Sequence, residues 1–381
     1  MIEQPIYLDY NATTPVDEQV LQAMLPYFKE SFGNASSVQH AYGWDAEEAV
    51  SMARDQVGRL IGVKPQNLIF TSGATEAINL GIRGAVASNE SKNHIITCCA
   101  EHKAVLDTCD YLKSIGVEIT MLDVNAEGLI DLAELQSAIQ ENTLMVCVMS
   151  ANNETGVLQE MDLISQVCEE NKVLLFSDIT QSVGKIPQNL QESNIDIAAF
   201  SSHKLYGPKG VGALYVNDLS TIAPMIYGGG HEKGLRSGTL NVPGIVGFGK
   251  ACEVAGQLLN SEIDRLKKLR DFLESELLQL GGIQINGQKT NRLSHVSNVS
   301  FEDIVGSRLI RSLKGIAVSQ GSACNSSVVE PSHVLKAMGL SDQLAFSSLR
   351  ISLGRFTSEE EVRKAIQIIR SVIEQQRMKV L

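Results

Sequence analysis

Short apolar runs alternate with longer segments of helical periodicity between about residues 50 and 250. The runs lie at 68–70, 94–98, 144–149, 173–176 and 195–200. Continuous apolar runs separated by helices are typical of buried strands in a mainly parallel sheet that is covered on both faces. The pattern therefore predicts a large α/β domain. Ligands of such sheets bind beyond the carboxyl ends of the strands, so the polar residues that follow these runs form one candidate site.

The pattern changes after about residue 256. A helix is predicted over 263–280, because its apolar positions follow helical spacing with charges between them, and Gly281 and Gly282 end it. Shorter strand-like segments follow at 297–301 and 316–319. A last helix is predicted from Thr357, where Glu360 completes a capping box. We expect a smaller α+β domain over 256–381, after a large domain that ends at 255.

Composition narrows the possible classes of function. The 381 residues carry 44 acidic and 32 basic side chains, a formal charge of −12, which argues against direct binding to a nucleic-acid backbone. The seven cysteines include no C-x-x-C pair. We therefore expect reduced thiols in a cytoplasmic protein, and we expect no metal site. The N-terminus lacks the features of a signal peptide, and no apolar run approaches the roughly 20 residues that span a bilayer.

Two glycine-containing segments resemble phosphate-binding loops. Residues 70–77 (FTSGATEA) predict a strand, a turn of small residues and a helix start, where free backbone N–H groups favour an anion. A plain capped turn is the alternative. Residues 244–251 (GIVGFGKA) nearly match a nucleotide-binding loop, but Ala251 replaces the hydroxyl residue that would hold Mg²⁺, and no strand precedes it. Those glycines are better explained by close helix packing.

Three polar residues beyond apolar strands are candidates for catalysis. Lys204 follows the run at 195–200; partial burial at the mouth of a sheet would lower its pKa and suit imine formation with an aldehyde. Asp178 follows the run at 173–176 and is either a helix cap or the partner of a protonated pyridine nitrogen. His102 is either a structural hydrogen-bonding residue or a ring that stacks on a cofactor and moves protons.

One cysteine differs from the other six in its surroundings. Cys324 lies in a small, polar segment (QGSACNSS, 320–327), whereas the others occur in apolar or helical contexts that predict buried packing. A thiol in a polar segment is either a surface residue without function or a nucleophile that reacts as its thiolate.

Six segments of the chain, taken together and in order, resemble one family of proteins. They are TSGATEA at 71–77, EHKAVL at 101–106, NNETG at 152–156, SSHKLYGPKGVG at 201–212, RSGTLN at 236–241 and GSACNS at 321–326. Together they resemble the pyridoxal-phosphate-dependent cysteine desulfurases of the NifS/IscS type, within the class V aminotransferase group. The match runs from residue 7 to residue 355. It implies a fold-type I pyridoxal-phosphate transferase, with a large cofactor-binding domain at 15–255 and a small domain, formed by 1–14 and 256–381, that carries the cysteine segment.

The resemblance also implies roles for individual residues. Lys204 would bind the cofactor aldehyde as an imine, and Cys324 would carry the sulfur as a persulfide, with His102 stacked on the cofactor ring. Asp178 would pair with the pyridine nitrogen and Gln181 with the phenolic oxygen. The phosphate would be held by Ala74, Thr75, Ser201 and His203, and by Thr239 of the neighbouring subunit, which implies a homodimer. Asn153 would contact the cofactor and, with Arg350, hold the substrate carboxylate, since a guanidinium donates two parallel hydrogen bonds to that anion.

The implied reaction converts L-cysteine to L-alanine and leaves its sulfur on Cys324 for an acceptor protein. That acceptor would serve iron–sulfur cluster assembly, tRNA thiolation or DNA phosphorothioation. The segments at 34–37 and 318–322 look closer to the phosphorothioation branch. The chain also ends soon after the last predicted helix, which puts docking of an iron–sulfur scaffold through a C-terminal tail in doubt.

Three alternatives stay open at this point. A selenocysteine lyase or another class V enzyme would share the fold, although an aminotransferase has no need for the thiol in GSACNS. A non-catalytic sulfur-relay scaffold would keep the fold without its chemistry. The presence of Lys204, Asp178, His102 and Cys324 together argues against that reading.

Overall fold

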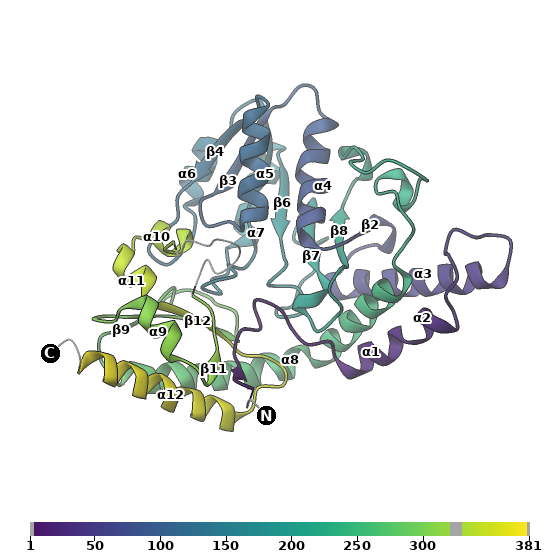
Figure 1. Cartoon of the computed structure of the whole chain (residues 1–381). Coiled ribbons are helices and arrows are strands. Elements are labelled where there is room, and N and C mark those ends of the chain that lie inside the picture. The colour runs from purple at the N-terminus through teal and green to yellow at the C-terminus, as the bar shows by residue number, and fades with distance from the viewer. Residues whose placement is uncertain (1–3, 321–329, 379–381) are drawn as a thin grey trace.

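A seven-stranded sheet forms the centre of the larger part of the molecule (Figure 1). The computed structural model describes residues 4–320 and 330–378. The strand order is β2-β8-β7-β6-β5-β3-β4, and of these seven strands β8 runs in the direction opposite to the other six. The strands are β2 (Leu68–Thr71), β3 (His94–Cys98), β4 (Glu118–Leu122), β5 (Thr143–Cys147), β6 (Leu174–Asp178), β7 (Ile197–Ser201) and β8 (Gly212–Val216). The predicted α/β class with a mainly parallel sheet is confirmed.

Helices cover both faces of this sheet, which explains why its inner strands are continuous apolar runs. One face packs against α4 (Ala74–Ala87) and α5 (Lys103–Ser114). The other face packs against α3 (Ala41–Ile61), α6 (Leu132–Ala138), α7 (Met161–Asn171) and the first part of α8 (Val242–Leu278). Helices α1 (Glu18–Met24) and α2 (Pro26–Lys29) lie along α8. Short 3-10 turns are η1 (Pro65–Asn67), η2 (Ser202–Lys204), η3 (Leu219–Thr221) and η4 (Glu232–Gly234).

A second apolar core lies in the smaller part. Its antiparallel sheet has the order β12-β10-β9, with β9 (Ile283–Ile285), β10 (Val296–Phe301) and β12 (Ser348–Ser352). The last part of α8 and helices α9 (Gly306–Ser312) and α12 (Glu359–Arg377) complete this core. Strand β1 (Ile6–Tyr7) pairs in parallel with β11 (Ile316–Ala317), and α10 (His333–Ala337) and α11 (Asp342–Phe346) lie nearby. We propose that these two cores mark the division predicted at 255.

Helix α8 joins the two cores and is longer than the sequence pattern predicts. It begins at Val242 rather than near residue 263, and its 37 residues end at Leu278, just before Gly281 and Gly282. Its early glycines pack closely: a Cβ at Gly247 would lie 2.5 Å from Met24 Sδ, and one at Gly249 would lie 2.6 Å from Ala53 Cα. These contacts confirm that the glycines serve helix packing.

The capping box of the last helix lies one residue later than predicted. The Ser358 side chain accepts from Glu361 N, and the Glu361 carboxylate accepts from Ser358 N at 2.8 Å. Thr357 is buried instead, and its hydroxyl accepts from Gly354 N. Among the described residues, no helix combines the length and apolar character needed to cross a bilayer.

Candidate active site

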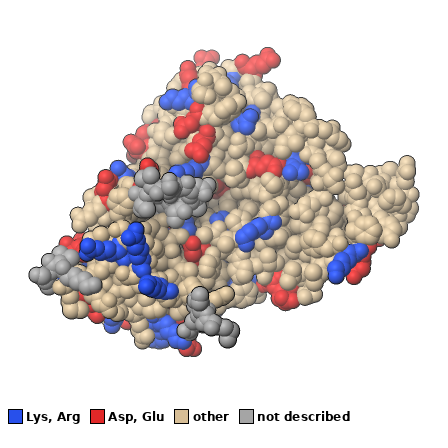
Figure 2. Space-filling view, viewed as in Figure 1, with Lys and Arg blue, Asp and Glu red and all other residues tan. Residues whose placement is uncertain are grey.

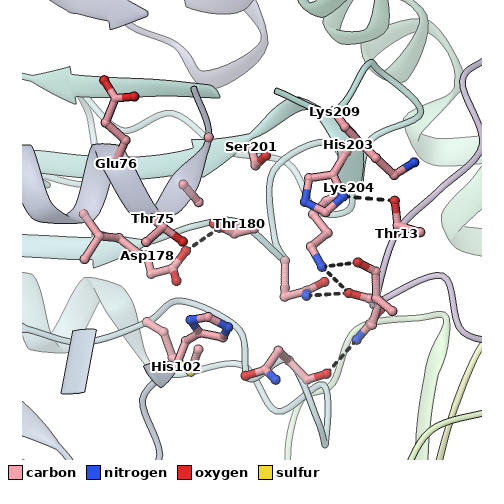
Figure 3. A pocket seen from close by; sticks show the side chains of 18 of the residues that line it. Thr13, Thr75, Glu76, His102, Asp178, Thr180, Ser201, His203, Lys204 and Lys209 are labelled. Carbon is pink, nitrogen blue, oxygen red and sulfur yellow. Dashed lines mark hydrogen bonds between the residues drawn. The ribbon is translucent and has the colours of Figure 1, made fainter. Parts of the chain in front are cut away.

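A cavity of about 590 Å³ opens at the carboxyl ends of β3, β6 and β7 (Figure 3). Its wall also includes the start of α4, residues 11–13 of the N-terminal segment and Arg350 from β12. Among the residues predicted to form the site, those that line it are Ala74, Thr75, His102, Asn153, Asp178, Gln181, Ser201, His203, Lys204 and Arg350. The fold therefore brings together side chains that are up to 276 residues apart, from Ala74 to Arg350.

The Lys204 side chain reaches the cavity from η2, directly after β7. Its Nζ donates to the carbonyl oxygens of Asn11 and Ala12, the second at 2.7 Å. Gln181 Nε2 donates to the same Asn11 carbonyl at 3.1 Å. These bonds hold the N-terminal segment against the amine and give the amine a defined position (Figure 3).

Asp178 lies at the end of β6, on the opposite side of the cavity from Lys204 (Figure 3). Its Oδ1 accepts from Thr180 N at 2.9 Å, which fixes the carboxylate and leaves Oδ2 for a ligand. The Thr180 hydroxyl is buried and has no hydrogen-bond partner among the described residues. The two side chains thus present a carboxylate and a hydroxyl to the same space.

His102 lies beside Asp178 and caps the start of α5. Its Nδ1 accepts from Ala104 N at 3.1 Å, so the proton of the neutral ring is on Nε2. Burial lowers the pKa of His102; the Asp178 carboxylate opposes this effect and Lys204 adds to it. The ring is therefore neutral at pH 7, with an Nε2–H that can donate.

The other end of the cavity favours an anion. Helix α4, which has 14 residues, begins at Ala74 without a side-chain cap. The backbone N–H groups of its first turn are therefore available to a ligand. Ser201 and His203 line the same cavity. Burial, together with the charges of Lys204 and Lys209, lowers the pKa of His203 to about 4, so this ring is also neutral at pH 7.

Arg350 is held on the wall of the cavity by two partners. Its Nη2 donates to Asp9 Oδ1 at 2.8 Å, and its Nη1 donates to the Asn153 carbonyl at 3.0 Å. Its Nε is buried and has no partner among the described residues. A guanidinium fixed in this way is suited to a small carboxylate ligand.

Two predicted residues are not part of this wall. Thr239 is exposed and does not line the cavity of its own chain. Cys324 falls in 321–329, outside the described residues. Of the six cysteines predicted to be buried, Cys99 is only partly so, whereas the other five are buried.

Asn11 is the main functional residue that the sequence pattern misses. Its carbonyl accepts from Lys204 and Gln181, its Nδ2 donates to the Asn153 carbonyl, and its Oδ1 bonds with His295 Nε2. The signal available was the polar stretch NATT at 11–14, directly after a short apolar run.

Comparison with known proteins agrees with this geometry. The family model for class-V aminotransferases matches residues 6–364. The chain belongs to the class-V aminotransferase family. Over 370 residues it is 50% identical to a protein named cysteine desulfurase IscS from Anaeromyxobacter sp. (strain Fw109-5), covering 96% of this chain and 91% of the relative.

Solved structures of related proteins share the fold of this class-V member. A NifS-like protein superposes with a TM-score of 0.91 at 39% identity, over 98% of this chain and all of the other. A structure described as SspA in complex with cysteine superposes with a TM-score of 0.82 at 38% identity, over 93% of this chain and all of the other.

The cofactor of this enzyme family is pyridoxal phosphate, and the cavity fits it. An amine and a carboxylate face each other across the cavity, Thr180 offers a buried hydroxyl without a partner among the described residues, and α4 starts without a side-chain cap. The amine suits an aldehyde, the carboxylate and the hydroxyl suit the polar atoms of a ring, and the helix start suits a phosphate.

Proposed function

We propose that this enzyme is a cysteine desulfurase, which converts L-cysteine to L-alanine and transfers the sulfur to an acceptor protein. The observation that carries the proposal is that Lys204, Asp178 and Arg350 line one cavity. The first offers an amine, the second a fixed carboxylate and the third a guanidinium for the substrate carboxylate. The relatives named cysteine desulfurase and the neighbour described in complex with cysteine support the choice of substrate.

Different residues of this chain would bind different parts of the cofactor. Asp178 would bind the pyridine nitrogen, Gln181 the phenolic oxygen, and Lys204 the aldehyde, while His102 lies against the ring. Ala74, Thr75, Ser201 and His203 would hold the phosphate. When bound, pyridoxal phosphate withdraws electrons from Cα of cysteine, which acidifies the Cα proton and weakens the Cβ–Sγ bond.

The protein side chains then position the substrate and move its proton. Arg350 binds the substrate carboxylate, with Asp9 and the Asn153 carbonyl fixing the direction of the guanidinium. Lys204 Nζ takes the Cα proton. The carbonyl oxygens of Asn11 and Ala12 hold this amine at the cavity wall, where it can reach the substrate. His102 stays neutral and donates from Nε2, since a proton on Nδ1 would break its bond to Ala104 N.

We propose that Cys324 is the residue of the enzyme that receives the sulfur atom from the substrate. Its thiolate attacks the substrate sulfur, the Cβ–Sγ bond breaks, and the net change is L-cysteine plus a thiol giving L-alanine plus a persulfide. The described flanks support this assignment. Ser319 pairs through its backbone with Arg350, and His333 Nε2 bonds with the Glu101 carbonyl at 3.0 Å, next to His102.

Measuring alanine and sulfide tests the activity. The protein with pyridoxal phosphate, L-cysteine and dithiothreitol should release both in equal amounts, and Lys204→Ala should release neither. Production of a keto acid from cysteine that depends on an added keto-acid acceptor, without sulfide, would instead identify an aminotransferase.

We also propose that two copies of the enzyme form a homodimer, in the cytoplasm. Large apolar side chains are exposed on α2, on the start of α3 and on the segment between them, in the part that projects at the right of Figure 1. Their exposed fractions are 59% for Phe28, 65% for Phe32, 77% for Val38, 52% for Tyr42 and 58% for Trp44. Burying such a patch against a second copy would remove it from water. The exposed Thr239 could then contact the phosphate group of the cofactor that the second copy binds.

Light scattering during size-exclusion chromatography tests this proposal. The enzyme should elute with twice its chain mass, and Phe32→Asp combined with Trp44→Asp should shift it to one chain mass. A wild-type enzyme with the mass of a single chain at micromolar concentration would contradict it.

A further inference from the structure

Three cations lie on the outer side of α9 and just after its end, and we call them the basic face of α9. Arg308, Arg311 and Lys314 are exposed at three-residue spacing, whereas Leu309 and Leu313 are buried in the core of the smaller part. Figure 2 shows basic atoms gathered on this part of the surface, at the position of α9 in Figure 1. None of the three side chains forms an ion pair or a hydrogen bond with a described residue.

Several cations on the other helices of the smaller part have acidic partners. On α8, Lys267 pairs with Asp271 at 2.7 Å; on α12, Arg363 pairs with Glu359 at 2.6 Å and Lys364 with Glu360 at 2.8 Å. The nearest acidic residues in the chain, Glu302 and Asp303, precede α9, and the Glu302 carboxylate lies beside Gly282. In a chain of net charge −12, three neighbouring cations without acidic partners among the described residues form a local positive surface.

The basic face is tied to the segment that carries Cys324. Gln320 Nε2 donates to the carbonyl of Gly306, the first residue of α9, at 2.9 Å, and to the Phe346 carbonyl at 3.0 Å. Cys324 follows Gln320 by four residues, and four residues span at most about 14 Å. A protein that binds at Cys324 can therefore also cover this face, where its own side chains would meet these charges directly.

We propose that the basic face of α9 docks the sulfur acceptor, and that the acceptor carries acidic side chains beside its receiving thiol. This inference rests on the proposed function. In the transfer, the acceptor thiolate attacks the outer sulfur of the Cys324 persulfide, the S–S bond breaks, and Cys324 leaves as a thiolate. The acceptor becomes the persulfide, so the step needs no oxidant or reductant. Complementary charge raises the rate of encounter and weakens with added salt.

Synthetic peptide thiols test this charge preference. One peptide surrounds a single cysteine with four glutamates, and its match has glutamines in their place. The enzyme is loaded with sulfur by L-cysteine, freed of excess cysteine and mixed with each peptide, and loss of the persulfide is followed by mass spectrometry. We expect discharge to the acidic peptide to be about ten-fold faster in the wild type than in Arg308→Glu/Arg311→Glu/Lys314→Glu, in the range that steering produces. The glutamine peptide should react at the same rate with the wild type and with this variant. That comparison controls for differences in intrinsic reactivity between the persulfides of the two proteins.

A matched variant controls for net charge. Lys64→Glu/Lys113→Glu/Lys268→Glu reverses three exposed cations elsewhere, and it should keep the wild-type rate with the acidic peptide. At 0.5 M NaCl the advantage of the wild type should fall to less than about two-fold, because screening then acts within a few ångströms. Equal rates for all three proteins at low salt, or an advantage that persists at high salt, would overturn the proposal.

Two further measurements separate this proposal from the activity itself. Alanine formation with dithiothreitol as the neutral acceptor should be the same in the wild type and the α9 variant, which shows that the variant is folded. Anisotropy of the labelled acidic peptide reports binding without any chemistry. If cysteine yields no alanine, the proposed function fails, and loss of peptide binding in the α9 variant still decides whether the surface binds acidic partners.

Discussion

Asp9 joins Arg350 to Ser319 through the two oxygens of one carboxylate. Oδ1 accepts from Arg350 Nη2 at 2.8 Å, and Oδ2 accepts from the Ser319 hydroxyl at 2.8 Å. The residue proposed to bind the substrate carboxylate is thereby tied to the described flank of the segment that carries Cys324. Asp9 positions both without lining the cavity itself.

Replacing Asp9 by Asn should weaken the binding of cysteine more than it slows the chemistry. The amide keeps the shape but removes the charge that orients Arg350, so KM should rise about ten-fold, corresponding to about 1.4 kcal/mol, with kcat reduced less. Steady-state kinetics with L-cysteine check this. Asp264→Asn, at an exposed position of α8, is the matched control and should behave as the wild type. A large fall in kcat at unchanged KM would contradict the assignment.

Loss of the Lys204 amine should abolish covalent attachment of the cofactor as well as turnover. Lys204→Ala removes the group that holds the aldehyde and moves the Cα proton, and loss of proton transfer alone costs about 10²–10⁴-fold in rate. Borohydride reduction followed by peptide mapping should place the label on residue 204 in the wild type and in Lys209→Ala. A label on another lysine would show that the pocket has been assigned wrongly.

Much of this fold follows from the apolar pattern, and the exceptions have physical causes. The buried strands β2, β3, β5, β6 and β7 were predicted because they are continuous apolar runs. Strand β4 was missed because it is partly exposed at the edge of the sheet, and β8 because a glycine-rich loop leads into it. The helix predicted from residue 263 is too short, because glycines lower helix propensity in the first part of α8. The glycines at 244–249 were assigned to helix packing, but the sequence did not show that they belong to this same helix or that they contact α1 and α3.

The site was predictable where side chains do the chemistry. Lys204, Asp178 and His102 follow buried strands and were identified as candidates from that position. The roles of Gln181, Ser201 and Arg350 come from the resemblance and stay predictions; all three residues line one cavity. Asn11 was not found because it acts largely through its backbone carbonyl, and a main-chain group leaves no signature in the sequence.

The stability of the enzyme should fall between pH 6.5 and pH 4 in part because of His203. Its pKa is lowered to about 4 in the fold by burial, from the ordinary value near 6.5. Within this window the unfolded chain binds a proton that the folded chain does not, so the free energy of unfolding decreases as the pH falls. Urea titrations at pH 7.0 and pH 4.5 should show a smaller decrease for His203→Gln than for the wild type. Equal decreases would refute this contribution.

Two glycines of α8 should respond oppositely to the same substitution. Gly249→Ala would place a Cβ 2.6 Å from Ala53 Cα, where backbone has to move, so it should lower the free energy of unfolding by about 1–3 kcal/mol. Gly256→Ala meets only Leu60 Cδ1, at 3.6 Å, and should raise it by about 0.5–1 kcal/mol through helix propensity. Chemical denaturation of both variants measures the difference. A loss at Gly256 as large as that at Gly249 would contradict the packing explanation.

The location of the transferred sulfur tests the central claim most directly. After brief exposure to L-cysteine without reductant, the enzyme is alkylated and digested, and each cysteine peptide is weighed. We predict one additional sulfur atom on the peptide that contains Cys324, and none there in Lys204→Ala, while Cys324→Ser should carry no persulfide. Additional sulfur on a different cysteine, or on Cys324 in the absence of the Lys204 amine, would contradict the account.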